Sequence, residues 1–457
     1  MAALRGRRPG TVPSRLRLLR GVLFATAAGL AGILATGGVT LSASWSDIRD
    51  HSAPQVTSAT GLYFTLNDMD AQLANRLMPG AQRAEASTLY DQRRAEAAGH
   101  LRELAEATED DPAAERDVAE AITDLGAYEE LAARALLLSE QGRRPTAVAT
   151  YNSASDLMRT RLLPEADRLV IVNDAAFERT YQESSDAQSV VRKAFLLTGL
   201  FLLALLALLQ VYLLSRFRRV INPGAAAASA LMLVVLVTGL VEISGQREQL
   251  RIARHDAFDS VVALTRARAV SYDANADESR YLLDRAGAAG HERHFLAKSQ
   301  QLMHLPGATI STYDADLTAA LGRYRSDTAD LPFTGYFGDE FRNITFAGER
   351  SAAERVLAAY QIYQRDDRTI RALATAGKLS EAVAFCTSHA PGNSNYAFDQ
   401  YDKALGELIA INVAAYEDAS AKGADRALTT YLGLAGAALA AAGLAALGLR
   451  PRLAEFR

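Results

Sequence analysis

The chain has 457 residues, of which 49% are hydrophobic, and its 49 basic and 53 acidic residues give a formal net charge of −4. This near balance hides an asymmetry, because arginines gather beside long apolar runs and an excess of acidic residues lies between those runs. The single cysteine, Cys386, excludes an intramolecular disulfide framework.

Four apolar runs are long enough to cross a bilayer core of about 30 Å. They span residues 21–42, 194–214, 224–244 and 428–449. A cleaved signal peptide is the rival interpretation of the first run, but that run is longer than the usual apolar part of roughly 7–15 residues. We therefore expect four transmembrane helices, the first of them uncleaved.

The arginines predict the orientation, because short cytoplasmic segments carry the excess of Lys and Arg. They lie in segment 1–20, in segment 215–223 as Arg216, Arg218 and Arg219, and in segment 450–457. We expect a multi-pass plasma-membrane protein with both termini in the cytoplasm and with segments 43–193 and 245–427 outside the cell. Topology and the lipid bilayer explain these arginines without nucleic-acid binding. Trp45, the only tryptophan, is predicted to anchor at the outer interface.

Segment 43–193 is predicted to form four helices. It is interrupted near Pro79-Gly80, at 109–112 and at 142–145, and its outer helices run into the first two spans. Val118, Ile122, Leu125, Tyr128 and Ala132 recur at spacings of three and four, so they are expected on one buried stripe. The predicted fold is an all-α membrane protein with four transmembrane helices and two tandem extracytoplasmic four-helix bundles that resemble sensor domains.

An internal repeat relates the two exported segments. GRRPTAVAT at 142–150 aligns with GKLSEAVAF at 377–385, and YFTLNDMD at 63–70 aligns with SYDANADE at 271–278. The second alignment pairs Asn67 with Asn275 and Asp70 with Glu278. The two offsets, 235 and 208 residues, differ by 27, so an insertion is predicted within about 286–347.

The insertion contains LPFTGYFGDEFRNITFAGE at 331–349, where five aromatic residues lie among Gly, Asp, Glu and Asn. We expect a structured loop at the membrane-distal end of the second bundle. Aromatic residues often anchor interfaces, which favours a partner-binding surface, whereas the alternative is that the rings cap the bundle. The predicted partner-binding residues are Tyr336, Phe337, Asp339, Glu340, Phe341 and Asn343.

Polar residues near the start of each exported segment are candidates for ligand contact. Asn67 with Asp70, and Asn275 with Glu278, are three residues apart and share a helix face. They could bind a ligand's amino group or a partner, or they could form buried polar contacts that fix bundle register. Arg280 could pair with nearby acids or with a ligand carboxylate.

No catalytic, cofactor or metal site is predicted. His291 and His294 could share a helix face, but no HExxH pattern or nearby cysteine accompanies them, and His304 is distant. Cys386 lies beside His389 without a predicted orienting acid, so a packed thiol is favoured over a nucleophile. We therefore expect a protein that is not an enzyme.

Four spans, tandem exported helical segments, NADESRYLL at 275–283 and FRNITFAGE at 341–349 resemble the GlnX-type transmembrane signalling proteins of actinobacteria. That resemblance implies an amino-acid-binding lipoprotein (for glutamate, aspartate or glutamine) as the partner outside the cell, and a soluble cytoplasmic Ser/Thr protein kinase as the partner inside. Arg216, Arg218 and Arg219 are the expected cytoplasmic output.

Two other functions stay open: an accessory or scaffold subunit of an amino-acid uptake system, and a four-helix-bundle receptor that senses the amino acid directly. The sequence also leaves homo-oligomerisation open.

Overall fold

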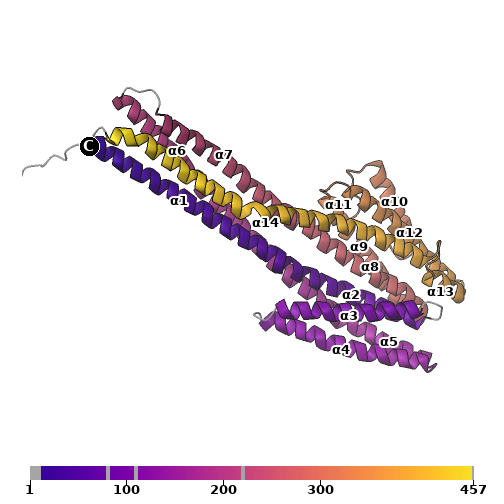
Figure 1. The fold of residues 1–457 in the computed structure, drawn as a ribbon. Helices are drawn as coiled ribbons and strands as arrows, with labels where there is room; N and C mark the ends of the chain where they lie inside the picture. Colours follow the sequence, from indigo (N-terminus) through magenta and orange to yellow (C-terminus); the bar gives the residue numbers. More distant parts are fainter. Residues whose placement is uncertain (1–11, 79–82, 108–111, 218–221, 455–457) are drawn as a thin grey trace, which may run out of the picture. The chain divides into compact units, whose positions relative to one another are not determined.

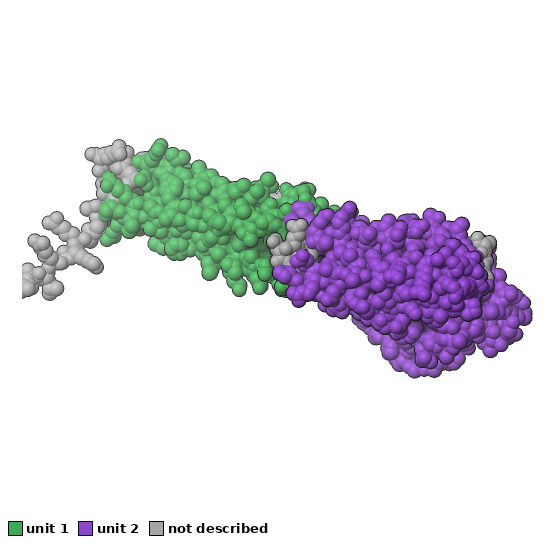
Figure 2. All heavy atoms as spheres, turned by 90° about the horizontal axis from the view of Figure 1, so that it is seen from below, with its two compact units in different colours: residues 1–49, 179–251, 418–457 green, residues 50–178, 252–417 purple. Residues whose placement is uncertain are grey.

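The computed structural model describes residues 12–78, 83–107, 112–217 and 222–454 (Figure 1). The chain divides into two compact units, which Figure 2 colours separately. Unit 1 comprises Met1–Arg49, Arg179–Arg251 and Asp418–Arg457, and unit 2 comprises Asp50–Glu178 and Ile252–Glu417. Within the described residues there is no β-strand, and one isolated antiparallel bridge joins His304 to Thr334.

Four helices are long and apolar enough to cross a membrane, which confirms the expected number of spans. The spans belong to α1 (Val12–Asp47), α6 (Leu163–Phe217), α7 (Pro223–Arg251) and α14 (Ser394–Ala454). Two of these helices are very long, at 55 residues for α6 and 61 for α14, and each contributes to both units. The all-α membrane fold predicted from hydropathy is therefore confirmed.

Trp45 is not the interfacial anchor that its position suggested. Its side chain is 1% exposed, and its Nε1 donates to Oε1 of Gln246 at 3.2 Å. Gly423 of α14 lies against the indole so closely that an added Cβ would be 2.1 Å from Cζ2 of Trp45. The prediction is wrong because the missing side chain at Gly423 leaves space for the ring between the helices of unit 1.

The first bundle, in unit 2, has the predicted helices. A π-helix, η1 (Ile48–Ser52), leads into α2 (Ala53–Leu77), which is followed by α3 (Arg83–Ala107), α4 (Pro112–Glu140) and α5 (Arg144–Leu157). A second π-helix, η2 (Met158–Leu162), joins α5 to α6. Four residues of the predicted stripe on α4 are buried, but Ile122 is 49% exposed and Ala121 is buried instead. The stripe follows the 3.6-residue period of the helix, which places Ala121 and not Ile122 on the inner face.

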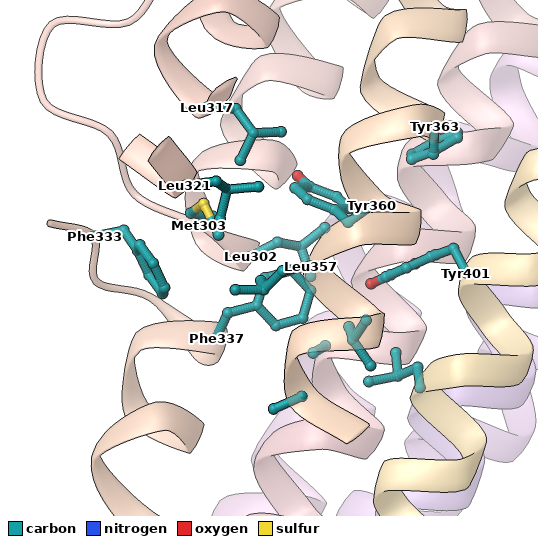
Figure 3. Close-up of a cluster of buried hydrophobic side chains, with 14 of the residues drawn as sticks. Leu302, Met303, Leu317, Leu321, Phe333, Phe337, Leu357, Tyr360, Tyr363 and Tyr401 are labelled. Atoms are coloured by element: carbon teal, nitrogen blue, oxygen red, sulfur yellow. The ribbon is translucent and has the colours of Figure 1, made fainter. Parts of the chain in front are cut away.

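The second bundle begins with η3 (Ile252–Phe258) and α8 (Asp259–Leu283). It continues with α9 (Ala288–Leu302), α10 (Tyr313–Ser326), α11 (Tyr336–Asn343), α12 (Glu349–Thr375), α13 (Leu379–Thr387) and the start of α14. Its core is unusually aromatic (Figure 3): Phe337 packs edge-on against Tyr360 at 5.2 Å, and Tyr360 lies 5.4 Å from Tyr401. These rings come from α11, α12 and α14, so their contacts hold these three helices together.

Segment 331–349 is not a distal loop. It contains α11, and the Nδ2 of Asn343 donates to the carbonyls of His255 and Asp256 and to Oγ of Ser260. Those acceptors lie in η3 and at the start of α8, which directly follow the third span in the chain. The expected location is therefore wrong. The π-helix η3 has a shifted backbone hydrogen-bonding pattern. The side-chain amide of Asn343 donates to two carbonyls of η3, and these bonds hold the segment beside it.

Equivalent features recur in the two bundles as an internal repeat would require. A π-helix precedes both α2 and α8, and each of these helices has 25 residues. Gly142 and Gly377, the first residues of the aligned nonapeptides, have φ of 75° and 79°, which glycine adopts readily. The next amide in each case donates to the carbonyl five residues back, Arg143 to Leu138 and Lys378 to Leu373. This shared geometry supports the alignment.

Candidate functional site between the two bundles

Helices α2 and α8 form the contact between the two bundles of unit 2. The rings of Phe64 and Tyr272, which the repeat alignment makes equivalent, touch edge to face at 5.2 Å. Arg268 of α8 stacks over Phe64 at 4.7 Å, and Ser279 donates to Oδ1 of Asn75 at 2.7 Å. The two bundles therefore contact each other through a pair of residues that the sequence alignment matches.

Arg280 is the central charge of this contact. Its guanidinium, 6% exposed, forms ion pairs with Asp70 of α2 at 2.6 Å, with Asp273 at 2.8 Å and with Asp277 at 2.6 Å. Burial by itself would lower the pKa of Arg280, but Tyr151 and the three carboxylates outweigh it and raise the pKa. The arginine is thus fixed in its charged form.

Asp70 is held from both sides of the contact. Besides Arg280, it accepts hydrogen bonds from Tyr128 and Ser155 of the first bundle, each at 2.9 Å. The structure therefore brings together Asp70 and Arg280, two of the five polar positions that the sequence singled out. It pairs Arg280 with acids of the protein, which was one of the two alternatives.

A cleft of about 180 Å³, here called cleft B, opens beside this network. Its lining comes from both bundles, and most of the lining residues have polar or charged side chains. The lining includes Asp70, Asn152, Ser155, Asp273, Asp277, Arg280, Asp284, His291, His294 and Lys298. Lys298 bridges Asp273 and Asp277 at 2.6 and 2.5 Å. Burial tends to raise the pKa of Asp273, but Lys298 and Arg280 lower it to about 2, so this acid is ionised.

A second cleft of about 130 Å³, here called cleft A, is lined by other neighbours of α2 and α8. Asp68, 1% exposed at its side chain, pairs with Arg93 of α3 at 2.5 Å. Burial raises the pKa of Asp68 despite this partner. His389 contacts Asp399 at 2.5 Å, and this hydrogen bond raises the pKa of His389. Both signs of charge therefore face cleft A.

Asn275 also lines cleft A, and its side chain has an unused donor. The residue is 6% exposed, and its Nδ2 has no hydrogen-bond partner among the described residues. A buried amide without a partner costs free energy unless a ligand or water satisfies it. Asn275 is thus the predicted polar position that points most directly to a ligand.

A wider groove of about 900 Å³ separates α5 from α13. Pro145 and Val148 line one side, and their aligned counterparts Ser380 and Val383 line the other. The repeated nonapeptides therefore face each other across this groove.

The remaining predicted site residues lie elsewhere. Asn67 is buried and donates to the carbonyl of Tyr63 within α2. Glu278 is buried in the second bundle and accepts a hydrogen bond from the hydroxyl of Ser394. Burial raises the pKa of the Tyr363 phenol, and the nearby Glu278 carboxylate raises that pKa further. Arg216 is in the last turn of α6, whereas Arg218 and Arg219 lie outside the described residues.

The residues predicted to bind a partner divide into two sets. Phe337 and Phe341 are buried, at 1% and 8% exposure, as the alternative interpretation of rings that cap the bundle expects. Glu340 is also buried, at 2% exposure, although it was expected to face a partner. Asp339 is exposed, and Tyr336 and Asn343 are half-buried. Partner docking by this segment stays a prediction that involves mainly Asp339 and Tyr336.

Cys386 behaves as a packed thiol. It is 1% exposed, and burial, followed by the nearby Glu278 carboxyl, raises the pKa of the thiol well above its usual value. The nucleophilic thiolate is therefore disfavoured.

Sequence reasoning missed the aspartates that lie on the same helix face as Arg280. Asp273, Asp277, Arg280 and Asp284 are spaced by four, three and four residues, which is the spacing of one helix face. That spacing was available in the sequence. The spacing does not predict, however, that His291 and His294 of α9 lie close to the same face of α8.

Residues 44–182 match the family model of the actinobacterial sensor domain. The matched region covers η1, α2 to α5, η2 and the first part of α6, which together make the first bundle. This match supports a sensor protein of actinobacterial type and a role in signal sensing or transduction. No curated protein and no solved structure matches the chain significantly.

Proposed function

We propose that the chain is a non-enzymatic signal transducer of the plasma membrane. It relays the availability of glutamate, aspartate or glutamine outside the cell, bound by an exported lipoprotein, to a Ser/Thr protein kinase in the cytoplasm. The sensor-domain match supports signal sensing. The choice of amino acid, lipoprotein and kinase comes from the resemblance to GlnX-type proteins.

The observation that carries the proposal is the continuity of α6 and α14. Each helix begins in a bundle and ends beyond a membrane span without a break. Helix shifts of about 1–2 Å are sufficient to switch protein interfaces between two states, so a shift of this size at the outer end of such a helix could reach its inner end. A coupling free energy of roughly 1–3 kcal/mol would change a partner's affinity several-fold or more.

The proposed output is the segment that joins α6 to α7. Residues 218–222 separate these two helices, so this connection is too short to form a catalytic domain. Its arginines would instead contact acidic groups of the kinase. Lysine at positions 216, 218 and 219 preserves the positive charge that sets topology but removes the planar fork of arginine.

The test combines this triple variant with a control in the first basic segment. R216K/R218K/R219K should weaken the response of kinase-dependent phosphorylation to the extracellular amino acid, whereas R15K/R17K/R20K should not. An unchanged response in the first variant would refute bidentate recognition by this connection. The N-terminal segment or the C-terminal tail would then be the better candidate.

Partner identity is tested by photocrosslinking in native membranes. A photoreactive amino acid at Asp339 should capture the exported lipoprotein, and one at Arg216 should capture the kinase. Capture of transporter subunits at both positions would instead support the accessory role in uptake. Capture of the lipoprotein only from Val383 would place docking at the groove between α5 and α13.

Direct sensing in cleft A is the second candidate, and the Nδ2 of Asn275, which has no hydrogen-bond partner among the described residues, is the observation that favours it. An amino acid presents an ammonium group and a carboxylate. In cleft A the carboxylate would compete with Asp68 for Arg93, and the ammonium group would compete with His389 for Asp399. Because both bundles line this cleft, binding requires the full chain rather than either bundle by itself.

Isothermal titration of the full chain with glutamate, aspartate and glutamine tests this candidate. Binding to the isolated chain that N275A weakens at least tenfold would support it, with N152A in cleft B as the control. No heat of binding without the lipoprotein would reject direct sensing and leave the relay proposal standing.

A further inference from the structure

Cleft B contains a histidine that makes no hydrogen bond. Both ring nitrogens of His291 are buried and have no hydrogen-bond partner among the described residues. His294 follows three residues later on α9, and Asp277 of α8 faces them both. One ligand atom from each of these three residues lies within 4.8 Å of the others.

We propose that Asp277, His291 and His294 bind a divalent transition-metal ion of the zinc class. Two imidazole nitrogens and a carboxylate oxygen are ligands that zinc takes in proteins, with a fourth position open to water. Calcium and magnesium prefer oxygen ligands only. Bonds of roughly 2.0–2.2 Å require the three side chains to close slightly around the ion.

The charge around the cleft favours a dication. Four carboxylates face it, from Asp70, Asp273, Asp277 and Asp284, against two cations, from Arg280 and Lys298. Asp156 and Arg159 pair with each other at the rim and add no net charge. With neutral histidines the net charge is −2, which one divalent ion neutralises.

The surroundings of the ligands also fit. While Nδ1 of His291 is 4.0 Å from Asp277, its Nε2 is 3.7 Å from Oδ2 of Asp284. A carboxylate behind the second nitrogen of a histidine is the arrangement that orients metal-bound imidazoles.

Asp277 retains capacity for an ion although it is already paired. It accepts one hydrogen bond from Arg280 at Oδ1 and one from Lys298 at Oδ2. A carboxylate has about four lone-pair positions, so two remain. Lys298 nevertheless competes electrostatically with a cation at this site, which makes it a useful position to vary.

The site would also strengthen the contact between the bundles. Asp284, behind His291, accepts a hydrogen bond from Asn152 of α5 at 2.9 Å. An ion that fixes His291 would therefore also stabilise the contact between Asp284, which directly follows α8, and the first bundle. This metal site goes beyond the signalling proposal, because neither the lipoprotein nor the kinase enters its test.

The experiment measures zinc bound to the purified full chain in nanodiscs, prepared without a polyhistidine tag and stripped with a chelator. Equilibrium dialysis should give one zinc ion per chain, and excess magnesium should not displace it. H291Q and H294Q should each lower the zinc affinity at least roughly tenfold. H304Q, which changes an exposed histidine of the same bundle, should leave it unchanged.

Two further readouts separate metal binding from misfolding. Zinc should raise the thermal midpoint of the wild type and of H304Q but not of H291Q/H294Q, whose metal-free midpoint should match that of the wild type. K298M should bind zinc more tightly, by roughly tenfold, because a competing charge is removed. Equal zinc binding by the wild type and a folded H291Q/H294Q variant, or weaker binding by K298M, would overturn the proposal.

Discussion

Removing the Arg280 guanidinium should weaken the contact between the two bundles and lower the thermal stability of unit 2. In R280M, Asp70 keeps only the hydroxyls of Tyr128 and Ser155 as partners and remains buried at 2% exposure. Breaking a buried ion pair from one side costs about 3–5 kcal/mol. For a unit of about 295 residues, roughly 2 °C per kcal/mol converts this cost into a fall of about 6–10 °C in the thermal midpoint.

The assay is thermal unfolding of the full chain in nanodiscs, followed by circular dichroism. R355M is the matched control, because Arg355 pairs with Glu407 at 3.3 Å with both side chains about half exposed. Such a surface pair contributes at most about 1 kcal/mol, so its midpoint should fall by no more than about 2 °C. D70N should restore part of the loss in R280M. A midpoint for R280M within about 2 °C of the wild type would refute the assigned role of Arg280.

Three further predictions concern other parts of the molecule. In chemical denaturation, F337A should lower the free energy of unfolding by about 3–5 kcal/mol. D339K, at an exposed position of the same helix, should change it by less than about 0.5 kcal/mol. Equal losses of unfolding free energy in the two variants would contradict the burial of Phe337. Burial and the neighbouring Glu349 raise the pKa of Glu340 to about 7. The folded state thus favours the protonated acid, so stability should fall as pH rises from about 4.5 through 7, and E340Q should reduce this fall. G423V should displace Trp45 and increase its quenching by brominated lipids, while unchanged quenching would contradict their contact.

The sequence predicted the helical architecture because its signals are local. A span requires about 20 apolar residues in succession, and the helices of the first bundle end where proline and glycine interrupt the pattern. Residues on one helix face are also predictable in outline, although the exposure of Ile122 shows that a stripe read from spacing can be rotated by one position.

The candidate site was less predictable because its partners come from different helices. Arg280 was singled out, but its pairing with Asp70 across 210 positions depends on how α2 and α8 pack. His291 and His294 gave no metal prediction, because Asp277, the third residue of the proposed site, lies on another helix. The aromatic segment 331–349 was ambiguous for a similar reason: composition does not say whether a ring faces a partner or the core.

The central claim is that the chain transmits a signal rather than assisting uptake. The most direct measurement follows amino-acid uptake and kinase-dependent phosphorylation together in cells that lack the chain, with the full-length chain restored as the control. The account predicts normal uptake of glutamate, aspartate and glutamine, with loss of the phosphorylation response to the extracellular amino acid. Impaired uptake, or a phosphorylation response that persists without the chain, would contradict it.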